Sequence, residues 1–224
     1  MHTASSAQDE SNTDLSAELE QRIGNDLFDQ GWSQQDGFLS VELSHALAAE
    51  CRALIASGAM KKAGIGRGEE LTIRPDVRGD HIKWLRRGES AACDRYLHLM
   101  AQLQTALNRS FFLGLADYES HFAFYPPGTS YQTHLDRFRD DDKRVISAVI
   151  YLNDAWLPEH GGALRLHPED KPAVDVLPLA GRLALFLSDS MPHEVLPATR
   201  DRLSLAGWFR PVSYTHLTLP TICS

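Results

Sequence analysis

The stretch YESHFAFYPPGTSYQTHLD, residues 118–136, decides the fold class of this chain. It contains two of a series of short segments, 118–125 and 131–136, that are rich in aromatic and β-branched residues and that Pro and Gly separate. Such segments, bounded by turn-forming residues, are typical of β-strands. Six more follow: VISAVIYL (145–152), GALRLH (162–167), AVDVL (173–177), RLALFL (182–187), HEVLP (193–197) and RLSLAGWF (202–209). The pattern predicts a mainly β chain with a jelly-roll (double-stranded β-helix) core.

The first half of the chain reads as helical support for this core. Leu19, Ile23, Leu27 and Phe28 recur at helical spacing and predict a helix over about 15–30. Ser40 is a candidate N-cap for a second helix, and a third is expected over about 90–109. Residues 58–80 are rich in Gly and charge, which indicates a long hairpin or a flexible loop. We therefore predict one domain over 15–212, with helical support over about 15–110 and a jelly-roll core over about 117–210.

Both ends of the chain differ in composition from this domain. Residues 1–14 are small, polar and acidic, and we expect them to be disordered. Residues 213–224 follow a plausible last strand with an abrupt change of composition, and we interpret them as a non-native tail.

The composition restricts the class of protein. The chain has 224 residues, of which 43% are hydrophobic and 23% charged, as expected for a soluble globular protein. No apolar run suggests a membrane span, and no signal peptide is visible. Three cysteines without a CxxC motif fit a reducing cytoplasm. The net charge of −8 argues against general nucleic-acid binding, although residues 61–87 form a basic segment that could attract one particular partner.

His134 and Asp136 are the first candidate metal ligands. Residues two apart on a strand point to the same face, but such a pair alone carries little information. His193 begins a later predicted strand and supplies a third ligand. Two His and one carboxylate leave positions open on a metal and suit Fe(II) oxygen chemistry. Arg202, expected on the strand beside that of His193, offers a two-pronged guanidinium for the distal carboxylate of a 2-oxo acid.

These residues resemble the Fe(II)/2-oxoglutarate-dependent dioxygenases, and in particular the oxygen-sensor-type prolyl 4-hydroxylases and their bacterial relatives. The resemblance covers about residues 64–210. The stretch RGDHIKW (78–84) is similar to the mobile substrate-covering loop of that group. The core strands resemble it in order: FYPPGTSYQTHLD (124–136), VIYLND (149–154), HGGALRLHPE (160–169), SDSMPHEVLPATR (188–200) and RLSLAGWF (202–209).

The resemblance implies a role for each matching residue. The iron ligands would be His134, Asp136 and His193, and the residues near the cosubstrate Arg202, Tyr151 and Tyr125. The substrate side would be lined by Tyr131, Arg144 and Trp208, together with Arg78 and Asp80 of the covering loop. The implied cofactor is Fe(II), with 2-oxoglutarate and O₂ as cosubstrates and ascorbate as a supporting reductant. Residues 137–144, RFRDDDKR, depart from the family pattern.

We therefore expect a cytoplasmic enzyme that hydroxylates a proline within a protein, with elongation factor Tu as the candidate target. The reaction would convert 2-oxoglutarate to succinate and CO₂. One alternative is the same chemistry on a free amino acid, a small metabolite or a non-prolyl side chain. Another is a non-catalytic jelly-roll module with a structural metal. No membrane or nucleic-acid partner is expected, and the oligomeric state stays open.

Structural roles compete with several of these assignments. Arg202 could pair with Asp201 or Asp189, and Arg78 with Asp80 could only hold its own loop together. The tyrosines could be ordinary core residues. The remaining strand histidines, His121, His160 and His167, are expected at the surface or at strand edges rather than as ligands.

Overall fold

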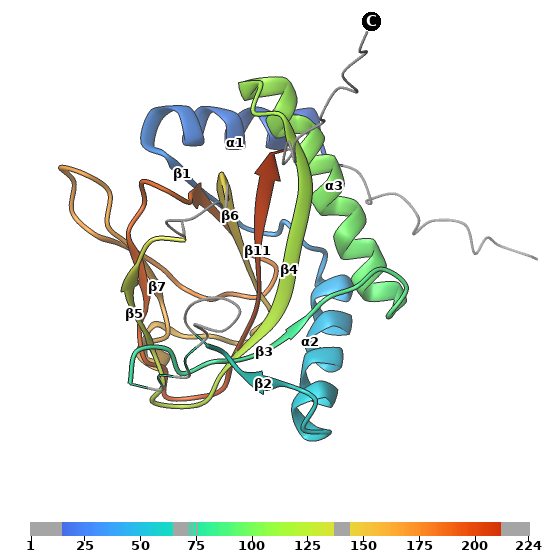
Figure 1. Cartoon of the computed structure of the whole chain (residues 1–224), viewed down its shortest axis with the longest axis vertical. Coiled ribbons are helices and arrows are strands. Elements are labelled where there is room, and N and C mark those ends of the chain that lie inside the picture. The colour runs from blue at the N-terminus through green and yellow to red at the C-terminus, as the bar shows by residue number, and fades with distance from the viewer. Residues whose placement is uncertain (1–14, 65–71, 73, 75, 137–143, 212–224) are drawn as a thin grey trace, which may run out of the picture.

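Two antiparallel sheets form the core of the protein (Figure 1). The structure is a computed structural model and describes residues 15–64, 72, 74, 76–136 and 144–211. The predictions for both chain ends, for part of the hairpin or loop over 58–80 and for nearly all of 137–144 lie outside these residues. The mainly β jelly-roll prediction is confirmed.

The larger sheet has seven strands in the order β1-β9-β6-β11-β4-β3-β2. Its strands are β1 (Trp32–Gln35), β2 (Lys61–Lys62), β3 (His81–Trp84), β4 (Leu115–Tyr125), β6 (Ile146–Tyr151), β9 (Leu183–Leu187) and β11 (Arg202–Pro211). The smaller sheet has the order β5-β10-β7-β8. Its strands are β5 (Tyr131–His134), β7 (Leu164–Leu166), β8 (Val174–Val176) and β10 (His193–Val195). A short 3₁₀ helix, η2, covers Pro158–His160.

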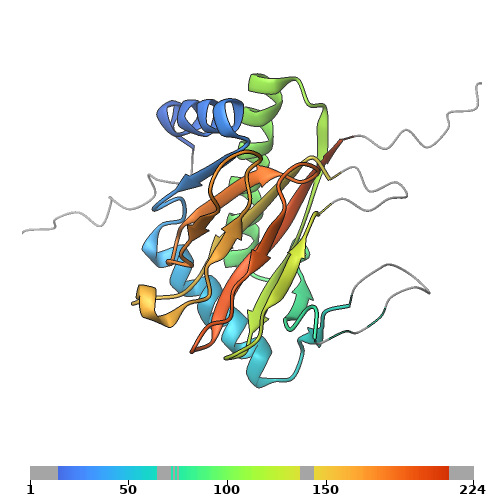
Figure 2. The ribbon, with the colours of Figure 1, turned by 90° about the vertical axis from the view of Figure 1, so that its left-hand side faces the viewer.

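Three helices cover one face of the larger sheet (Figure 2). They are α1 (Ala17–Gln30), α2 (Val41–Ala56) and α3 (Ala91–Phe111). Each begins at a serine, Ser16, Ser40 or Ser90, whose hydroxyl accepts a backbone N–H of the first turn. The Ser40 cap is confirmed. Phe28 is an exception to the predicted α1 stripe, because its side chain is 81% exposed while Ile23 and Leu27 are buried.

The strands of the larger sheet divide their side chains between two environments. On β11, Leu203, Leu205 and Phe209 pack into the core beneath the helices. The alternate residues of β11, beginning with Arg202, line a cavity on the opposite face. The smaller sheet contributes to the same cavity, so one space lies between the two sheets.

The register of β4, β11 and β6 arranges the cavity floor in rows. Arg202 pairs with Tyr125, Ser204 with Ala123 and Tyr151, and Ala206 with His121 and Val149. Trp208 pairs with Glu119 and Ser147. Trp208 in the last row lies six positions after Arg202 in the first, about 20 Å along the strand. The side chains of Ala123, Ser204 and Ala206 in the middle rows are small and leave room for a ligand.

None of the helices in the described part of the chain has the length and hydropathy that a membrane span requires.

Candidate metal and cosubstrate site

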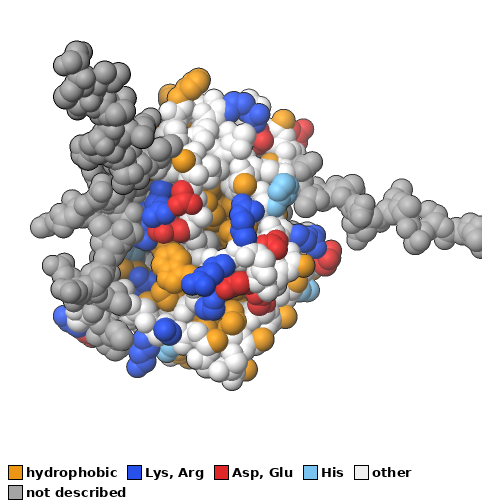
Figure 3. Space-filling model, turned by 45° about the vertical axis from the view of Figure 1, so that its right-hand side comes forward, with side chains coloured by type: hydrophobic (Ala, Val, Ile, Leu, Met, Phe, Trp, Pro, Cys, Tyr) orange, Lys and Arg blue, Asp and Glu red, His pale blue; other side chains and the backbone are white. Residues whose placement is uncertain are grey.

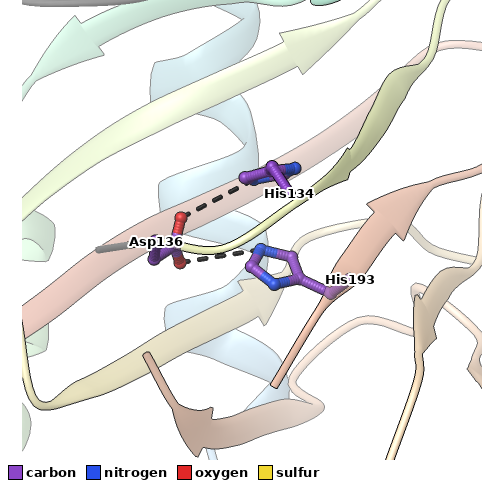
Figure 4. Close-up of side chains that lie close together, drawn as sticks. All are labelled: His134, Asp136 and His193. Carbon is purple, nitrogen blue, oxygen red and sulfur yellow. Dashed lines mark ion pairs between the residues drawn. The ribbon is translucent and has the colours of Figure 1, made fainter. Parts of the chain in front are cut away.

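His134, Asp136 and His193 converge in the cavity between the sheets (Figure 4). His134 is the last residue of β5 and His193 the first of β10, and the register pairs the two directly. Asp136 lies two residues beyond His134, past the end of β5, and its backbone N–H donates to the Ser188 carbonyl at 3.1 Å. The pairing of β5 with β10 therefore brings His193 next to His134 and Asp136, although it lies nearly 60 residues later in the sequence.

The three side chains are spaced for one shared metal ion. His134 Nε2 lies 3.6 Å from Asp136 Oδ1, and His193 Nε2 lies 3.6 Å from Asp136 Oδ2. One candidate ligand atom from each residue lies within 4.8 Å of the other two. Hydrogen bonds are shorter than 3.6 Å, whereas metal bonds of about 2.1 Å from one centre span distances on this scale. Two imidazoles and one carboxylate are also a suitable donor set for Fe(II).

Both histidines are oriented with Nε2 toward the shared point. His134 Nδ1 contacts the Gln132 carbonyl at 2.7 Å, and His193 Nδ1 contacts the Met191 carbonyl at 3.0 Å. A carbonyl only accepts, so Nδ1 carries the proton and the Nε2 lone pair is available. Burial lowers the pKa of His193 to about 4, which keeps this imidazole neutral and able to bind a metal.

Asp136 is held as a carboxylate by its neighbours. Burial opposes its ionisation, but the two histidines and the Ser147 hydroxyl outweigh this effect and keep the pKa of Asp136 below its usual range. Ser147 Oγ donates to Asp136 Oδ2 at 2.7 Å and is itself 2.8 Å from Ser188 Oγ. Both serines are fully buried. Ser147 therefore fixes the orientation of the carboxylate.

Arg202 lies at the far end of the cavity floor and is fully buried. Its Nε donates to the Gly162 carbonyl at 2.7 Å, and Nη1 contacts Ser204 Oγ at 3.4 Å. Its acceptors are thus a carbonyl and a hydroxyl, not Asp201 or Asp189. Nη2 has no hydrogen-bond partner. A buried guanidinium with a free donor is suited to an anionic ligand.

Two tyrosines flank this arginine, each with its ring centroid 5.2 Å from the guanidinium carbon. They are Tyr125 on β4 and Tyr151 on β6. The Tyr151 hydroxyl is buried without a partner, and burial raises its pKa to about 12, so it stays a protonated donor. Tyr151 and Arg202 together offer two unpaired donors on neighbouring side chains, and a carboxylate is an acceptor for donors of this kind.

The expected position of Arg202 relative to His193 is wrong. Arg202 begins β11 in the larger sheet, whereas His193 begins β10 in the smaller one. The chain crosses between the sheets after β10 instead of forming a hairpin within one sheet. The two residues consequently face the same cavity from opposite sheets.

Segment 78–80 lies beside the metal triad. Arg78 and Asp80 form a two-pronged pair with distances of 2.7 and 3.0 Å, and Asp80 is fully buried. The Arg78 guanidinium carbon lies 4.8 Å from the centroid of the Tyr131 ring. That ring stacks on the His134 imidazole at 3.6 Å. The pair therefore holds its own segment and also contacts the residues that surround the metal site.

Arg144 and Trp208 occupy the other end of the floor. The guanidinium carbon of Arg144 lies 3.5 Å from the Trp208 ring centroid, and its Nη2 donates to Glu119 at 3.0 Å. All the residues predicted for the site line this one cavity except Tyr151, which is fully buried with its ring next to the Arg202 guanidinium.

His121 is a cavity residue that the sequence did not reveal. It is buried on β4 and lines the cavity, so its expected place at the surface or a strand edge is wrong. His160 and His167 are partly exposed, and neither lines the cavity. Ser147 and Ser188 were also missed. Ser147 lies among apolar residues of β6, and Ser188 directly follows the apolar strand β9. These positions suggest burial, but they do not indicate which serine contacts a metal ligand.

Comparisons with known proteins agree with this geometry. The family model described as 2OG-Fe(II) oxygenase superfamily matches residues 120–210. Prolyl hydroxylase EGLN3 of Mus musculus is 30% identical over 195 residues, which cover 82% of this chain and 80% of the relative.

Two solved structures are also similar. A Pseudomonas putida prolyl-4-hydroxylase has a TM-score of 0.78 and 50% identity, covering 87% of this chain and 100% of that one. A Trichoplax adhaerens prolyl hydroxylase, solved with a peptide fragment of the hypoxia inducible factor oxygen degradation domain, has a TM-score of 0.76 and 27% identity. That likeness covers 86% of this chain and 89% of the other.

Proposed function

Because the chain belongs to the 2OG-Fe(II) oxygenase superfamily and is a dioxygenase of the prolyl 4-hydroxylase type, we propose that it hydroxylates a prolyl residue in a protein substrate. Elongation factor Tu is our candidate target, as the likeness to bacterial prolyl hydroxylases implies. The observation that supports the oxygenase reaction is a pair of donors without partners: Arg202 Nη2, on a residue that lines the cavity of the triad, and the neighbouring Tyr151 Oη.

Each part of the cavity takes one role in this proposal. His134, Asp136 and His193 would hold Fe(II), and Arg202 with Tyr151 would bind the distal carboxylate of 2-oxoglutarate. Bound Fe(II), 2-oxoglutarate and O₂ supply the oxidising chemistry that turns C–H into C–OH and releases succinate and CO₂. The side chains of this protein then need not act as nucleophile or general base. They orient the ligands and keep water out of the buried end of the cavity.

A polypeptide substrate is favoured by the other end of the cavity. Trp208 lies there under the Arg144 guanidinium, and a second pair of this kind, Arg78 over Tyr131, lines the cavity beside the triad. Such groups can contact the apolar proline ring and the carbonyls that flank it. The Trichoplax adhaerens relative was solved with a peptide fragment, which supports the same kind of substrate for this chain.

The test is a reaction with Fe(II), 2-oxoglutarate, ascorbate and intact elongation factor Tu, followed by mass spectrometry. We expect a gain of one oxygen on a proline, with a matching amount of succinate. If no succinate forms under any condition, the oxygenase proposal fails. If succinate forms but no proline of elongation factor Tu is modified, only that target is wrong, and free proline, small amines and other proteins are tested in its place.

A variant ties this activity to the metal. His134→Ala should fold with nearly wild-type stability but should lose Fe(II) and succinate formation. If this variant unfolds when the metal is lost, the metal is structural and the non-catalytic alternative gains support.

A further inference from the structure

His121 is a buried imidazole in the cavity wall for which the proposed reaction has no role. It lies on β4 in the third row of the floor, where its register partners are Trp84 on β3 and Ala206 on β11. The methyl group of Ala206 is small, so it leaves space beside the imidazole. Trp84 is 43% exposed, so this row extends from the cavity toward the surface.

The tautomer of His121 is fixed by one hydrogen bond. Nδ1 lies 3.1 Å from the Phe122 carbonyl, which only accepts, so Nδ1 carries the proton. Nε2 is therefore a hydrogen-bond acceptor. The ring is held between two indoles, with centroids 5.0 Å from Trp84 and 5.5 Å from Trp208. Neither indole N–H donates a hydrogen bond to the His121 imidazole, and the Trp208 N–H is buried without a partner.

The surroundings of His121 favour a neutral ligand over a cationic one. Burial lowers the pKa of His121 to about 4, and Arg78 and Arg144 lower it further while Asp80 opposes them. The same two guanidinium groups disfavour the ammonium group of a free amino acid at this point. A neutral N–H donor is not repelled by these guanidinium groups. A backbone amide is the commonest neutral donor in a polypeptide.

We propose that His121 is a specificity-determining residue whose Nε2 accepts a hydrogen bond from a backbone amide N–H of the bound polypeptide. Proline itself has no N–H, so the donor belongs to a residue next to the hydroxylated proline. This inference rests on the proposed prolyl hydroxylation and adds to it a requirement for a peptide bond beside the target. It predicts that a polypeptide is preferred over free proline.

The first test compares two variants of the full chain on a panel of overlapping peptides that covers every proline of elongation factor Tu, with free proline as the small-molecule probe. His121→Leu removes the acceptor and should raise KM for peptide about tenfold or more, with a smaller effect on kcat. His121→Gln restores an acceptor and should recover most of this loss. The exposed His98 on α3 supplies the control, and His98→Leu should leave both constants unchanged.

The second test locates the donor. Peptides with one backbone amide methylated at a time lose one N–H each. For the wild-type protein, we expect one position next to the proline to weaken binding about tenfold. The same methyl group should have little further effect on His121→Leu, because both changes remove the same hydrogen bond.

Several results would overturn this role. Equal KM values for wild type and His121→Leu would do so, as would additive effects of the two changes or a preference for free proline. Stabilisation of each variant by Mn(II) with 2-oxoglutarate is measured in parallel, because a merely structural His121 would disturb that binding as well. Failure of the oxygenase proposal is distinguishable, since wild type would then form no succinate with any probe.

Discussion

The hydrogen bond from Ser147 to Asp136 gives a sharp test of how one residue tunes the metal site. Ser147→Ala should weaken Mn(II) binding about 10- to 100-fold, because the Asp136 carboxylate loses the donor that orients it. Ser147→Thr retains the hydroxyl and should restore most of the affinity. Isothermal titration of metal-free protein measures the effect without relying on turnover.

Ser33 provides a matched control for that prediction. Its hydroxyl is also buried and donates to an aspartate, Asp26, at 2.7 Å, but on β1. Ser33→Ala should lower the free energy of unfolding and leave Mn(II) affinity unchanged. Equal metal affinities for the two alanine variants would contradict the role given to Ser147.

Arg202 allows ligand binding and stability to be separated. In Arg202→Met the ligand-free protein should be at least as stable as wild type, because a buried charge without a carboxylate partner is removed. Addition of 2-oxoglutarate with Mn(II) should raise the melting temperature of wild type but add little beyond Mn(II) in the variant. Thermal unfolding with and without ligand measures both effects.

The buried Arg182 is the comparison for Arg202. It donates to the Asp36 carboxylate at 2.9 Å and lies outside the cavity. Arg182→Met should lower stability and keep the response to 2-oxoglutarate. If Arg202→Met keeps that response too, the carboxylate-binding role of Arg202 is wrong.

Sequence predicted some of these residues and missed others for a physical reason. His134, Asp136, His193 and Arg202 lie at or just beyond the ends of strands, and their order and flanking residues resemble a known family. His121 has similar surroundings in sequence, yet whether it points into the cavity depends on its register with Ala206 and Trp84. A single sequence does not contain that register.

At the scale of elements, two glycines should respond in opposite ways to the same substitution. A Cβ on Gly79 would lie 2.7 Å from Thr129 Cβ, so Gly79→Ala should cost about 1–3 kcal/mol of unfolding free energy. It should also separate segment 78–80 from the residues before β5. Gly24 in α1 has 3.8 Å to its nearest neighbour, and Gly24→Ala should add about 0.5–1 kcal/mol.

Urea unfolding measures both glycine variants, and KM for peptide distinguishes their functional effects. Gly79→Ala should raise KM because Arg78 is displaced from Tyr131, whereas Gly24→Ala should not change it. A Gly79→Ala protein as stable as wild type would show that the close contact of the new methyl group with Thr129 is relieved by a small shift, and this prediction would then be wrong.

The elements themselves were largely predictable, because helix caps and apolar periodicity are local signals. The eight strand segments after residue 117 correspond to β4 through β11. The assignment of each strand to one of the two sheets could not be predicted in this way, because it depends on pairing between strands that are distant in sequence. The expectation that Arg202 lies on the strand beside His193 failed because β10 and β11 belong to different sheets.

At the scale of the whole molecule, the two sheets contribute different parts of the site. The smaller sheet supplies both histidines of the triad, and the larger sheet supplies Arg202, both flanking tyrosines and His121. Trp84 and Trp208 flank His121, with ring centroids 5.0 and 5.5 Å from its imidazole. One face of the molecule has hydrophobic side chains among charged ones (Figure 3). A ligand held between the sheets therefore contacts both.

The stability of the whole molecule should depend on pH through His121. Its pKa is about 4 in the fold and about 6.5 in an unfolded chain, so the unfolded state binds more protons between these values. The free energy of unfolding should therefore be highest above pH 6.5 and fall as the pH decreases toward 4. The contribution of a fully buried group with this shift is about 3 kcal/mol at most.

Urea unfolding of metal-free protein at several values between pH 4.5 and 7.5 measures this dependence. His121→Gln has no titrating group at that position, so its free energy of unfolding should fall less steeply over the same range. His193 is present in both proteins, and its contribution cancels in the difference between their slopes. Parallel curves for wild type and His121→Gln would mean that the imidazole is hydrated or repositioned enough to titrate normally, and the cavity wall would then lack the neutral acceptor that substrate recognition by His121 requires.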